Sequence, residues 1–202
     1  MKELYVIATS NPGKVKEFAN QLGSDFYEIK SLSDIGFNEK IEETGSSFQE
    51  NASIKANAVC EFLEKKGIVA TVIADDSGLE VEALDGAPGV YSARYAGDDA
   101  SDQENYELLL SRLKGNLNRN ARFVCVLCVQ KVNESPIYFE GECKGIIIET
   151  PRGSEGFGYD PIFIPESNDR TFAEMTIAEK KALSHRGHAI KKLIEALKLS
   201  PN

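Results

Sequence analysis

One segment near the middle of the chain limits both the fold and the chemistry that the sequence allows. Residues 70–75 are rich in β-formers and predict a strand, which the turn-forming run Asp75-Asp76-Ser77-Gly78 is expected to end. Two neighbouring carboxylates repel each other by roughly a kcal/mol or more where solvent is partly excluded, and a divalent cation relieves that repulsion. Because Mg²⁺ favours carboxylates paired with substrate phosphates, the segment suggests a metal site, with a solvated turn as the alternative.

The length and composition are those of one globular domain. The 202 residues are long enough for a sizeable core, and the apolar (42%) and charged (27%) fractions are ordinary for a soluble protein. No apolar run approaches the roughly 18–20 residues that a membrane span needs, and no signal-peptide pattern begins the chain. We therefore expect a single domain over residues 1–202, no membrane partner and a cytoplasmic location.

The charge balance excludes one large class of partners. Lysine and arginine number 23 and aspartate and glutamate 32, so the net charge is −9, and only two histidines are present. Such a chain is poorly suited to the phosphate backbone of a nucleic acid polymer. A nucleotide partner must therefore be small, and it must arrive with a metal ion or meet a local group of basic side chains.

The four cysteines, Cys60, Cys125, Cys128 and Cys143, are expected to be free thiols. Cys125 and Cys128 have the C-x-x-C spacing, but they lie in a run that predicts a buried strand. Residues three apart on a strand point to opposite faces, so this pair cannot chelate one ion. A structural zinc or redox role is therefore less favoured than buried core thiols.

The N-terminal segment predicts a strand, a polar loop and a helix. Residues 4–8 are typical of a buried strand, Asn11 suits the N-cap of the following helix, Pro12 its first position, and Gly23 its end. Backbone N–H groups at such a helix start bind anions, and Lys14 lies in the first turn. The alternative is a plain strand-to-helix connection, because the P-loop motif G-x-x-x-x-G-K-[ST] is absent.

Capping patterns and periodicity predict the remaining elements. Ser46 and Gln49 form a capping-box pattern that would open a helix over about residues 47–66. On that helix the polar residues Asn51 and Lys55 share a face with apolar ones, either at its exposed edge or pointing into a cleft. The other expected elements are strands over 26–30, 121–131, 136–149 and 162–164, a loop over 31–45, a helix over 101–113, and a final helix capped by Ser184.

Two C-terminal segments carry candidate binding residues. Glycines alternate with aromatic residues between Gly153 and Pro161. Glycine allows close approach of the backbone to a ligand, and an exposed aromatic ring stacks on a base; the alternative is a flexible hairpin with a packed phenylalanine. Lys180, His185 and Arg186 form the densest group of basic residues, for which a solvated charge run is the alternative.

Five separated segments follow one another in an order that is highly specific, although each alone is a weak pattern. They are Thr9-Ser10-Asn11-Pro12-Gly13-Lys14, then Glu43-Thr44-Gly45 with Phe48-Gln49-Glu50-Asn51-Ala52, then Ala74-Asp75-Asp76-Ser77-Gly78-Leu79 continuing through residues 86–94, then Gly156-Phe157-Gly158-Tyr159-Asp160-Pro161, and Ser184-His185-Arg186. In these segments, which span nearly the whole chain, the sequence resembles the inosine/xanthosine triphosphate pyrophosphatases. Ser10 stands where that family commonly has glycine, which concerns the backbone shape of the first loop.

The resemblance implies a fold and a reaction. The fold is α/β, with two lobes around a long, mixed, twisted sheet and a substrate cleft between them, and the assembly is a homodimer. The reaction is hydrolysis of the α–β phosphoanhydride of a non-standard purine nucleoside triphosphate (ITP, dITP or XTP) to the monophosphate and pyrophosphate. The implied cofactor is Mg²⁺.

The resemblance also implies roles for the candidate site residues. Asp76 is the expected general base and a metal ligand, Glu43 is the other Mg²⁺ ligand, and Asp75 supports the metal site. The triphosphate would be held by Thr9, Ser10, Asn11, Pro12, Gly13, Lys14, Lys55 and Lys180, and Ser77 would also contact substrate. Phe157 would stack on the base. The other contacts to the base would come from Gly158, Tyr159, Asp160, His185 and Arg186. Of these, Asp160, His185 and Arg186 would read its polar edge.

Two other functions are compatible with parts of the sequence. A metal-dependent phosphatase acting on other nucleotides would release orthophosphate instead of pyrophosphate. A nucleotide-binding module without catalysis would need no general base, so the presence of Asp76, Glu43 and Lys14 argues against it.

Overall fold

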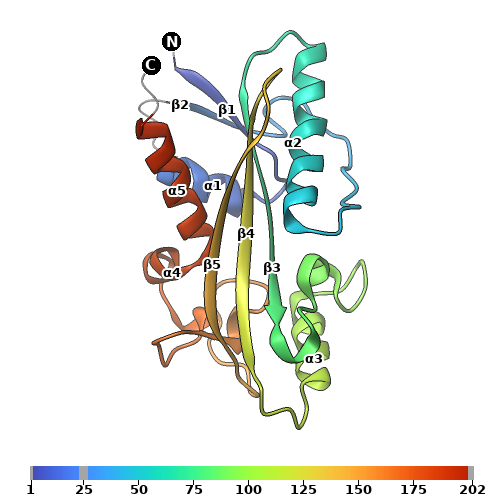
Figure 1. Cartoon of the computed structure of the whole chain (residues 1–202), viewed down its shortest axis with the longest axis vertical. Coiled ribbons are helices and arrows are strands. Elements are labelled where there is room, and N and C mark those ends of the chain that lie inside the picture. The colour runs from blue at the N-terminus through green and yellow to red at the C-terminus, as the bar shows by residue number, and fades with distance from the viewer. Residues whose placement is uncertain (1, 23–26, 200–202) are drawn as a thin grey trace. The chain divides into compact units, whose positions relative to one another are not determined.

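The computed structural model describes residues 2–22 and 27–199 and has an α/β fold (Figure 1). Six strands form one open sheet in the order β2-β1-β3-β4-β5-β6. β1 is parallel to β2 and β3, whereas β5 and β6 are antiparallel, so the predicted mixed sheet is confirmed. The strands are β1 (Glu3–Ile7), β2 (Tyr27–Ser31), β3 (Thr71–Val81), β4 (Asn120–Lys131), β5 (Ile137–Ile147) and β6 (Phe163–Pro165), and the helices are α1 (Pro12–Leu22), α2 (Phe48–Lys65), α3 (Asp102–Arg112), α4 (Ile177–Leu183) and α5 (His185–Leu199).

The chain divides into two compact units, each assembled from segments that are distant in sequence. The first unit comprises Met1–Asp76, Val126–Glu140 and Ala189–Asn202, and the second comprises Ser77–Cys125 and Gly141–His188. Each unit has a hydrophobic core of its own.

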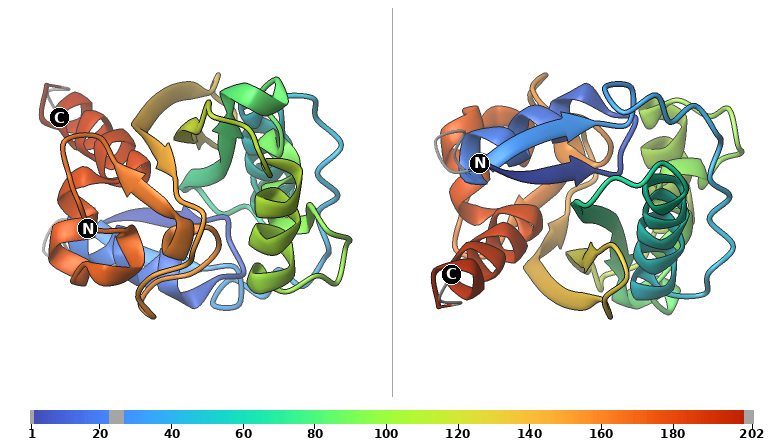
Figure 2. Two further views of the ribbon diagram at one scale, coloured as in Figure 1. Left: turned by 90° about the horizontal axis from the view of Figure 1, so that it is seen from below. Right: turned by 90° about the horizontal axis from the view of Figure 1, so that it is seen from above.

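The core of the first unit joins α2 to the parallel strands. Val59 and Leu63 lie one turn apart on α2 and are fully buried together with Val6 of β1 and Val72 of β3. β1 and β2, drawn in blue in Figure 2, run side by side in register over their whole length. β1 is also parallel to β3, but it pairs with Thr71–Ile73 near the start of that strand, so the loop after β1 begins beside Ala74 and not at the end of β3.

The core of the second unit is built around aromatic rings. The ring of Phe123 on β4 contacts the ring of Phe163 edge-on at a centroid distance of 4.7 Å, and both lie near Phe172. Leu79 of β3 and Leu109 of α3 complete this core and are fully buried. The aromatic cluster supports the loops that follow β5 and β6.

Strand β3 is longer than the sequence predicted. The expectation that it ends in a turn at Asp75-Asp76-Ser77-Gly78 is wrong, because β3 runs from Thr71 to Val81 with those four residues inside it. Leu79 and Val81, beyond these four residues, are fully buried. Burial of these two side chains outweighs the local turn preference of the residues before them.

The start of α2 also differs from its prediction. The capping box predicted for Ser46 and Gln49 is wrong by one residue: the Ser47 hydroxyl accepts the Glu50 N–H at 3.2 Å. The Glu50 carboxylate in turn accepts hydrogen bonds from the N–H and the hydroxyl of Ser46, at 2.6 and 2.8 Å. Two adjacent serines are therefore both used, one as the cap and the other as the partner of Glu50.

The other predicted elements are confirmed with small shifts at their ends. The predicted cap of the final helix is confirmed, since the Ser184 hydroxyl accepts the Gly187 N–H at 3.0 Å. The predicted helix end at Gly23 and strand start at Phe26 lie outside the described residues. In the part of the chain that the structure describes, no helix is long and apolar enough to span a membrane.

The four cysteines are free and buried, as predicted. Burial raises the pKa of Cys60 and Cys128 to about 11 and that of Cys143 to about 12. These thiols are therefore protonated at neutral pH and contribute to the two cores.

Candidate active site

The loop between β1 and α1 forms the first part of the candidate site. The Ala8 N–H donates to the Ile73 carbonyl at 2.8 Å, which holds the start of the loop against β3. The Asn11 side chain accepts hydrogen bonds from the N–H groups of Gly13 (2.8 Å) and Lys14 (3.3 Å), so the predicted N-cap is confirmed. An anion that bound these two N–H groups would have to compete with the Asn11 side chain.

A pocket of about 530 Å³ adjoins this loop in the first unit. Thr9, Ser10 and Pro12 form one side of it, and the segment from Ser31 to Glu39 contributes much of the rest. The three residues predicted to contact the triphosphate therefore lie beside open space rather than in the core.

Asp75 and Lys14 form an ion pair in the first unit. The Lys14 ammonium lies 2.8 Å from Asp75 Oδ2. The Asp75 side chain is 1% exposed and that of Lys14 is 21% exposed, so the carboxylate is buried while the lysine reaches the surface. Asp75 thereby holds the charged end of a lysine that α1 carries.

Asp76 has different partners. Its Oδ1 lies 3.1 Å from the Lys55 ammonium, and its Oδ2 accepts a hydrogen bond from Asn51 Nδ2 at 3.2 Å. The same Lys55 ammonium lies 3.2 Å from Glu43 Oε1. Two carboxylates thus converge on one ammonium group from α2. We call Glu43, Asn51, Lys55 and Asp76 the carboxylate–lysine cluster.

The two aspartates lie on opposite faces of the sheet, because successive residues of a strand alternate. Asp75 meets Lys14 from α1, and Asp76 meets Lys55 from α2. Repulsion between the two neighbouring carboxylates is therefore weaker in the folded chain than a shared turn would make it. Glu43 is the carboxylate that bonds the same ammonium group as Asp76.

Burial and charge shift the ionisation of this cluster. Burial raises the pKa of the Asp76 carboxyl above its ordinary value; Lys55 opposes this shift and Glu43 adds to it. Burial also acts to lower the pKa of Lys55, but the charges of Asp76, Asp75 and Glu43 outweigh burial, so this pKa is raised. Lys55 is therefore a stable cation beside an aspartate that takes up a proton more readily than usual.

The cluster offers a pair of ligands for a cation. Among the described residues, no three histidine, cysteine or acidic side chains are grouped as a ready-made metal site. Glu43 and Asp76 nevertheless direct one oxygen each at the Lys55 ammonium, which stands in for a positive ion between them. Carboxylate oxygens are the donors that Mg²⁺ prefers, and Mg²⁺ usually takes only one or two of them together with phosphates and water. The donor set fits this ion.

The second unit brings together Phe157 and Asp160, which were predicted to contact the base, and Lys180, which was predicted to hold the triphosphate. Phe157 is 52% exposed, and its N–H donates to Asp160 Oδ2 at 2.8 Å. The Lys180 ammonium bonds the same carboxylate oxygen and lies 4.6 Å from the centre of the Phe157 ring. An exposed ring on a loop that is fixed by a buried carboxylate suits stacking on a flat ligand.

Asp160, Arg186 and His185 are buried, so the solvated charge run considered for this region is wrong. Burial raises the pKa of Asp160, and the charges of Lys180 and Arg186 act to lower it. Arg186 therefore acts electrostatically on Asp160. The His185 ring is stacked on Phe123 at a centroid distance of 4.8 Å, which gives it a packing role.

Sequence reasoning missed contacts that hold these residues in place. The Gly158 N–H donates to Asp102 Oδ2 at 2.7 Å, and the Tyr159 hydroxyl donates to the Ser92 carbonyl at 2.9 Å. The Tyr159 side chain is 3% exposed and belongs to the core. Neither Asp102 nor Ser92 stands in a pattern that indicates a partner so distant in sequence.

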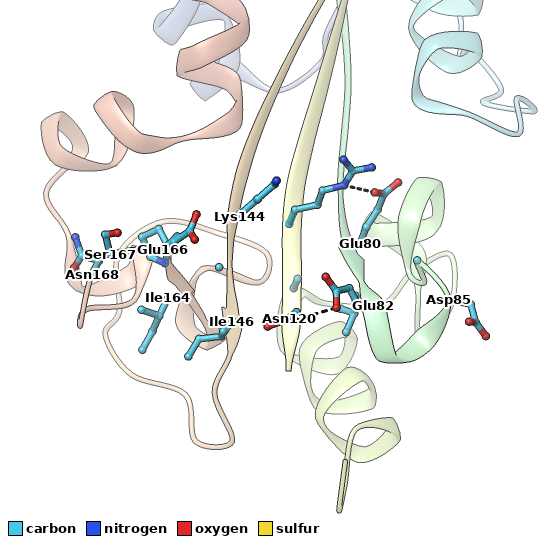
Figure 3. Close-up of a pocket in the computed structure, with 16 residues that line it drawn as sticks. Glu80, Glu82, Asp85, Asn120, Lys144, Ile146, Ile164, Glu166, Ser167 and Asn168 are labelled. Carbon is cyan, nitrogen blue, oxygen red and sulfur yellow. Dashed lines mark hydrogen bonds and ion pairs between the residues drawn. The ribbon is translucent and has the colours of Figure 1, made fainter. Parts of the chain in front are cut away.

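Another pocket of the second unit lies away from these residues. It has a volume of about 880 Å³ and spans the ends of β3 to β6 (Figure 3). Its lining includes ion-paired and hydrogen-bonded polar side chains, among them Glu80 with Arg122 and Glu82 with Asn120. None of the predicted site residues lines this pocket, so its size does not make it the candidate active site.

The chain is an α/β protein in which buried aspartates are paired with lysines. It belongs to the Ham1 family, whose model matches residues 5–196. The dITP/XTP pyrophosphatase of Bacillus subtilis (strain 168) is 53% identical to it, over 98% of each chain. The solved structure of the Staphylococcus aureus Ham1 protein is 41% identical with a TM-score of 0.89, over 97% of this chain and 98% of that one. A Mycobacterium abscessus structure, named nucleoside-triphosphatase / dITP/XTP pyrophosphatase, is 41% identical with a TM-score of 0.76, over 96% and 99% of the two chains.

The loop before Asp160 provides a test of the second unit. Gly156 has φ +82°, and a Cβ there would lie 2.1 Å from Asp160 Oδ2, the atom that holds Phe157. Gly86 has φ +86° with no atom within 4 Å of such a Cβ, so it is a matched control. We expect Gly86→Ala to lower the free energy of unfolding by about 1 kcal/mol from backbone strain alone. Gly156→Ala should lower the free energy of unfolding by about 1–3 kcal/mol more than Gly86→Ala does.

Urea unfolding midpoints at unchanged m-value measure this difference. Equal decreases in the free energy of unfolding for the two variants would show that the close approach of Gly156 to Asp160 does not affect stability.

Proposed function

We propose that this protein hydrolyses non-standard purine nucleoside triphosphates (ITP, dITP and XTP) to the monophosphate and pyrophosphate. The observation that carries the proposal is the buried Asp76 carboxylate, held by Asn51 and Lys55 and sharing the lysine with Glu43. Support comes from relatives about half identical over nearly the whole chain, which are named dITP/XTP pyrophosphatases. The reaction removes such nucleotides from the nucleotide pool.

We further propose that the enzyme depends on Mg²⁺, with Glu43 and Asp76 as its ligands from the protein. When bound, the ion supplies positive charge that the triphosphate and the carboxylates share. Lys55 already contacts both carboxylates and would remain beside the phosphates as a second cation. Asp75 is engaged with Lys14, which favours a supporting role for it over direct metal binding.

Asp76 is the proposed general base. The oxygen of a water molecule bonds to the α-phosphorus, the bridging bond from that phosphorus to the β-phosphate oxygen breaks, and pyrophosphate leaves; Asp76 takes up a proton of the water. A raised pKa brings the carboxylate closer to the working pH, which makes it a better proton acceptor. Asn51 and Lys55 bond the two oxygens of Asp76 and keep the carboxylate oriented.

The triphosphate is proposed to bind the Thr9–Lys14 loop and the lysines. Lys14 and Lys55 offer point charges, and Thr9 and Ser10 offer hydroxyls. Lys180 is also a proposed phosphate ligand, but its ammonium bonds Asp160, so a nucleotide would have to compete with that carboxylate. The local cations balance the anionic ligand although the net charge of the chain is −9.

The purine base is proposed to stack on Phe157. Asp160 and Arg186 would recognise its polar edge, and Gly158 and Tyr159 would hold the loop, through the Gly158 N–H and the Tyr159 hydroxyl. His185 would act through its packing on Phe123 unless substrate binding frees its ring. Ser77, the residue after Asp76 in β3, is partly exposed and is a further proposed substrate contact.

A panel of nucleoside triphosphates tests the proposed reaction. Each nucleotide is incubated with Mg²⁺, and pyrophosphate and orthophosphate are measured separately. Release of pyrophosphate from ITP, dITP and XTP supports the proposal. Orthophosphate as the first product would favour a metal-dependent phosphatase acting on other nucleotides, and binding without turnover would favour a non-catalytic nucleotide-binding module.

Two further properties are proposed on the resemblance of the sequence to its family. The protein is proposed to act as a homodimer and in the cytoplasm, with no membrane or nucleic acid polymer as partner. Light scattering during size-exclusion chromatography tests the dimer, because a mass near the 22.2 kDa of one chain contradicts it.

Loss of the Asp76 charge should remove catalysis without lowering stability. Asp76→Asn keeps the size of the side chain but removes the base, so we expect kcat to fall on the order of 10² or more. Folding raises the pKa of Asp76, so above this pKa the ionised carboxylate lowers stability relative to the protonated form. The melting temperature at neutral pH should therefore stay level or rise. Near-wild-type turnover at saturating Mg²⁺ would instead make Asp75 the candidate base.

Activity should require a divalent metal and increase with pH. Asp76 must be ionised both to accept a proton and to bind the metal, so turnover should fall at acidic pH. Chelation should abolish turnover, because the triphosphate and two carboxylates need a shared cation. Initial rates across a pH series, with and without EDTA, measure both effects. Turnover that survives exhaustive chelation contradicts the metal proposal.

Base choice should depend on Arg186. A guanidinium donates to the C6 keto oxygen of hypoxanthine, and adenine has no acceptor there, so ATP should be poorer than ITP by roughly 10² or more in kcat/KM. Arg186→Ala should shrink this ratio, and Phe157→Ala should weaken both nucleotides alike because stacking tolerates any base edge. Arg170 is an exposed arginine paired with Glu179, and Arg170→Ala is the control. This substitution should leave the ratio of kcat/KM for ITP to that for ATP unchanged.

Equal losses of kcat/KM for ITP and ATP in Arg186→Ala would show that Arg186 does not read the base. Melting temperatures of the variants separate such an effect from general loss of folded protein.

A further inference from the structure

Asn51 uses both ends of its side chain in the buried interior of the first unit. The side chain carries no exposed surface (0%). Its Oδ1 accepts the Gly45 N–H at 2.8 Å, and its Nδ2 donates to Asp76 Oδ2 at 3.2 Å. The orientation of the amide is fixed by its partners, since a backbone N–H only donates and a carboxylate only accepts.

The spacing on α2 makes this contact part of a larger arrangement. Asn51 and Lys55 are four residues apart and therefore lie one above the other on the same face of the helix. Asn51 bonds one oxygen of Asp76 and Lys55 bonds the other. Lys55 also contacts Glu43, which stands two residues before Gly45. One helix face thus contacts both the strand and the loop that carry the two carboxylates.

We propose that Asn51 is a positioning residue for the cation site, holding the Glu43 loop and Asp76 together so that the two carboxylates converge. This inference rests on the proposed roles of Glu43 and Asp76 as metal ligands. Asn51 itself touches neither the ion nor the substrate. Loss of its side chain leaves a partly buried N–H and a buried carboxylate oxygen each short of a partner. The Glu43 loop then has one bond fewer to fix its distance from Asp76.

The fit at Gly45 indicates how closely the loop lies against α2. A Cβ on Gly45 would meet Asn51 Oδ1 and Glu50 Cβ, both at 2.7 Å. Any larger residue there would push the loop away from Asn51. Gly45→Ala therefore disturbs the same link from the opposite side and leaves Asn51 itself in place.

The chain contains a matched control. Asn105 on α3 is also buried (1% exposed) and also uses both ends of its carboxamide. Its Oδ1 accepts the Ala96 N–H at 2.8 Å, and its Nδ2 donates to the Ala93 carbonyl at 3.2 Å. Asn105 bonds backbone groups at both ends, whereas Asn51 bonds a carboxylate at one end. Truncation of Asn105 reports the loss of stability from a buried asparagine in a helix.

The test compares metal binding in Asn51→Ala, Asn105→Ala and wild type. Mn²⁺ is the probe, because electron paramagnetic resonance measures its binding to the full-length protein without turnover. We expect both variants to melt at lower temperature. Only Asn51→Ala should bind Mn²⁺ about 10-fold or more weakly, as expected when a group that orients metal ligands is removed. The Mg²⁺ concentration for half-maximal turnover should rise in parallel.

Gly45→Ala is the second variant and should weaken Mn²⁺ in the same direction if Asn51→Ala does not fold. Wild-type affinity in the folded Asn51→Ala variant, or in Gly45→Ala when only that variant folds, overturns the inference and leaves the proposed function intact. Equal weakening in Asn105→Ala also overturns it, because the effect would then be one of stability. Failure of the wild type to bind Mn²⁺ or to need metal overturns the proposed metal site together with this inference.

Discussion

The contact between Asp76 and Lys55 is the interaction on which the candidate site depends. Both groups are mostly buried, which disfavours their charged forms, and each charge stabilises the other. Removal of Lys55 would leave the buried Asp76 carboxylate uncompensated, whereas Lys55 would still contact Glu43 if the Asp76 charge were removed. Because Lys55 also contacts Glu43, the pair extends to a loop far from β3 in sequence. The sheet, α2 and that loop are thus joined at one ammonium group.

Alternation along β3 separates two tasks that the sequence places side by side. Adjacent residues of a strand face opposite ways, so Asp75 and Asp76 meet different helices and different lysines. A helix would have put both aspartates on neighbouring parts of one surface, and a turn would have exposed them. Because β3 is a strand at this point, Asp75 pairs with Lys14, and Asp76 shares the Lys55 ammonium with Glu43.

Much of the fold followed from local signals, and the exceptions have tertiary causes. The cap at Asn11 and the final helix after Ser184 follow from residues within one turn. The far end of β3 could not be predicted from local signals, because buried Leu79 and Val81 override the turn preference of the residues before them. The site residues were recognised from motifs, but the partners of Asp76 and Gly158 are far away in sequence, so no local pattern predicts them.

The burial of the thiols has a consequence for chemical durability. With pKa values of about 11 to 12, Cys60, Cys128 and Cys143 are protonated thiols at neutral pH. Peroxides and alkylating reagents attack the thiolate, and all three residues are buried. None of them is among the residues proposed to act on the nucleotide. The catalytic machinery should therefore keep working where oxidants disable enzymes that rely on an exposed cysteine.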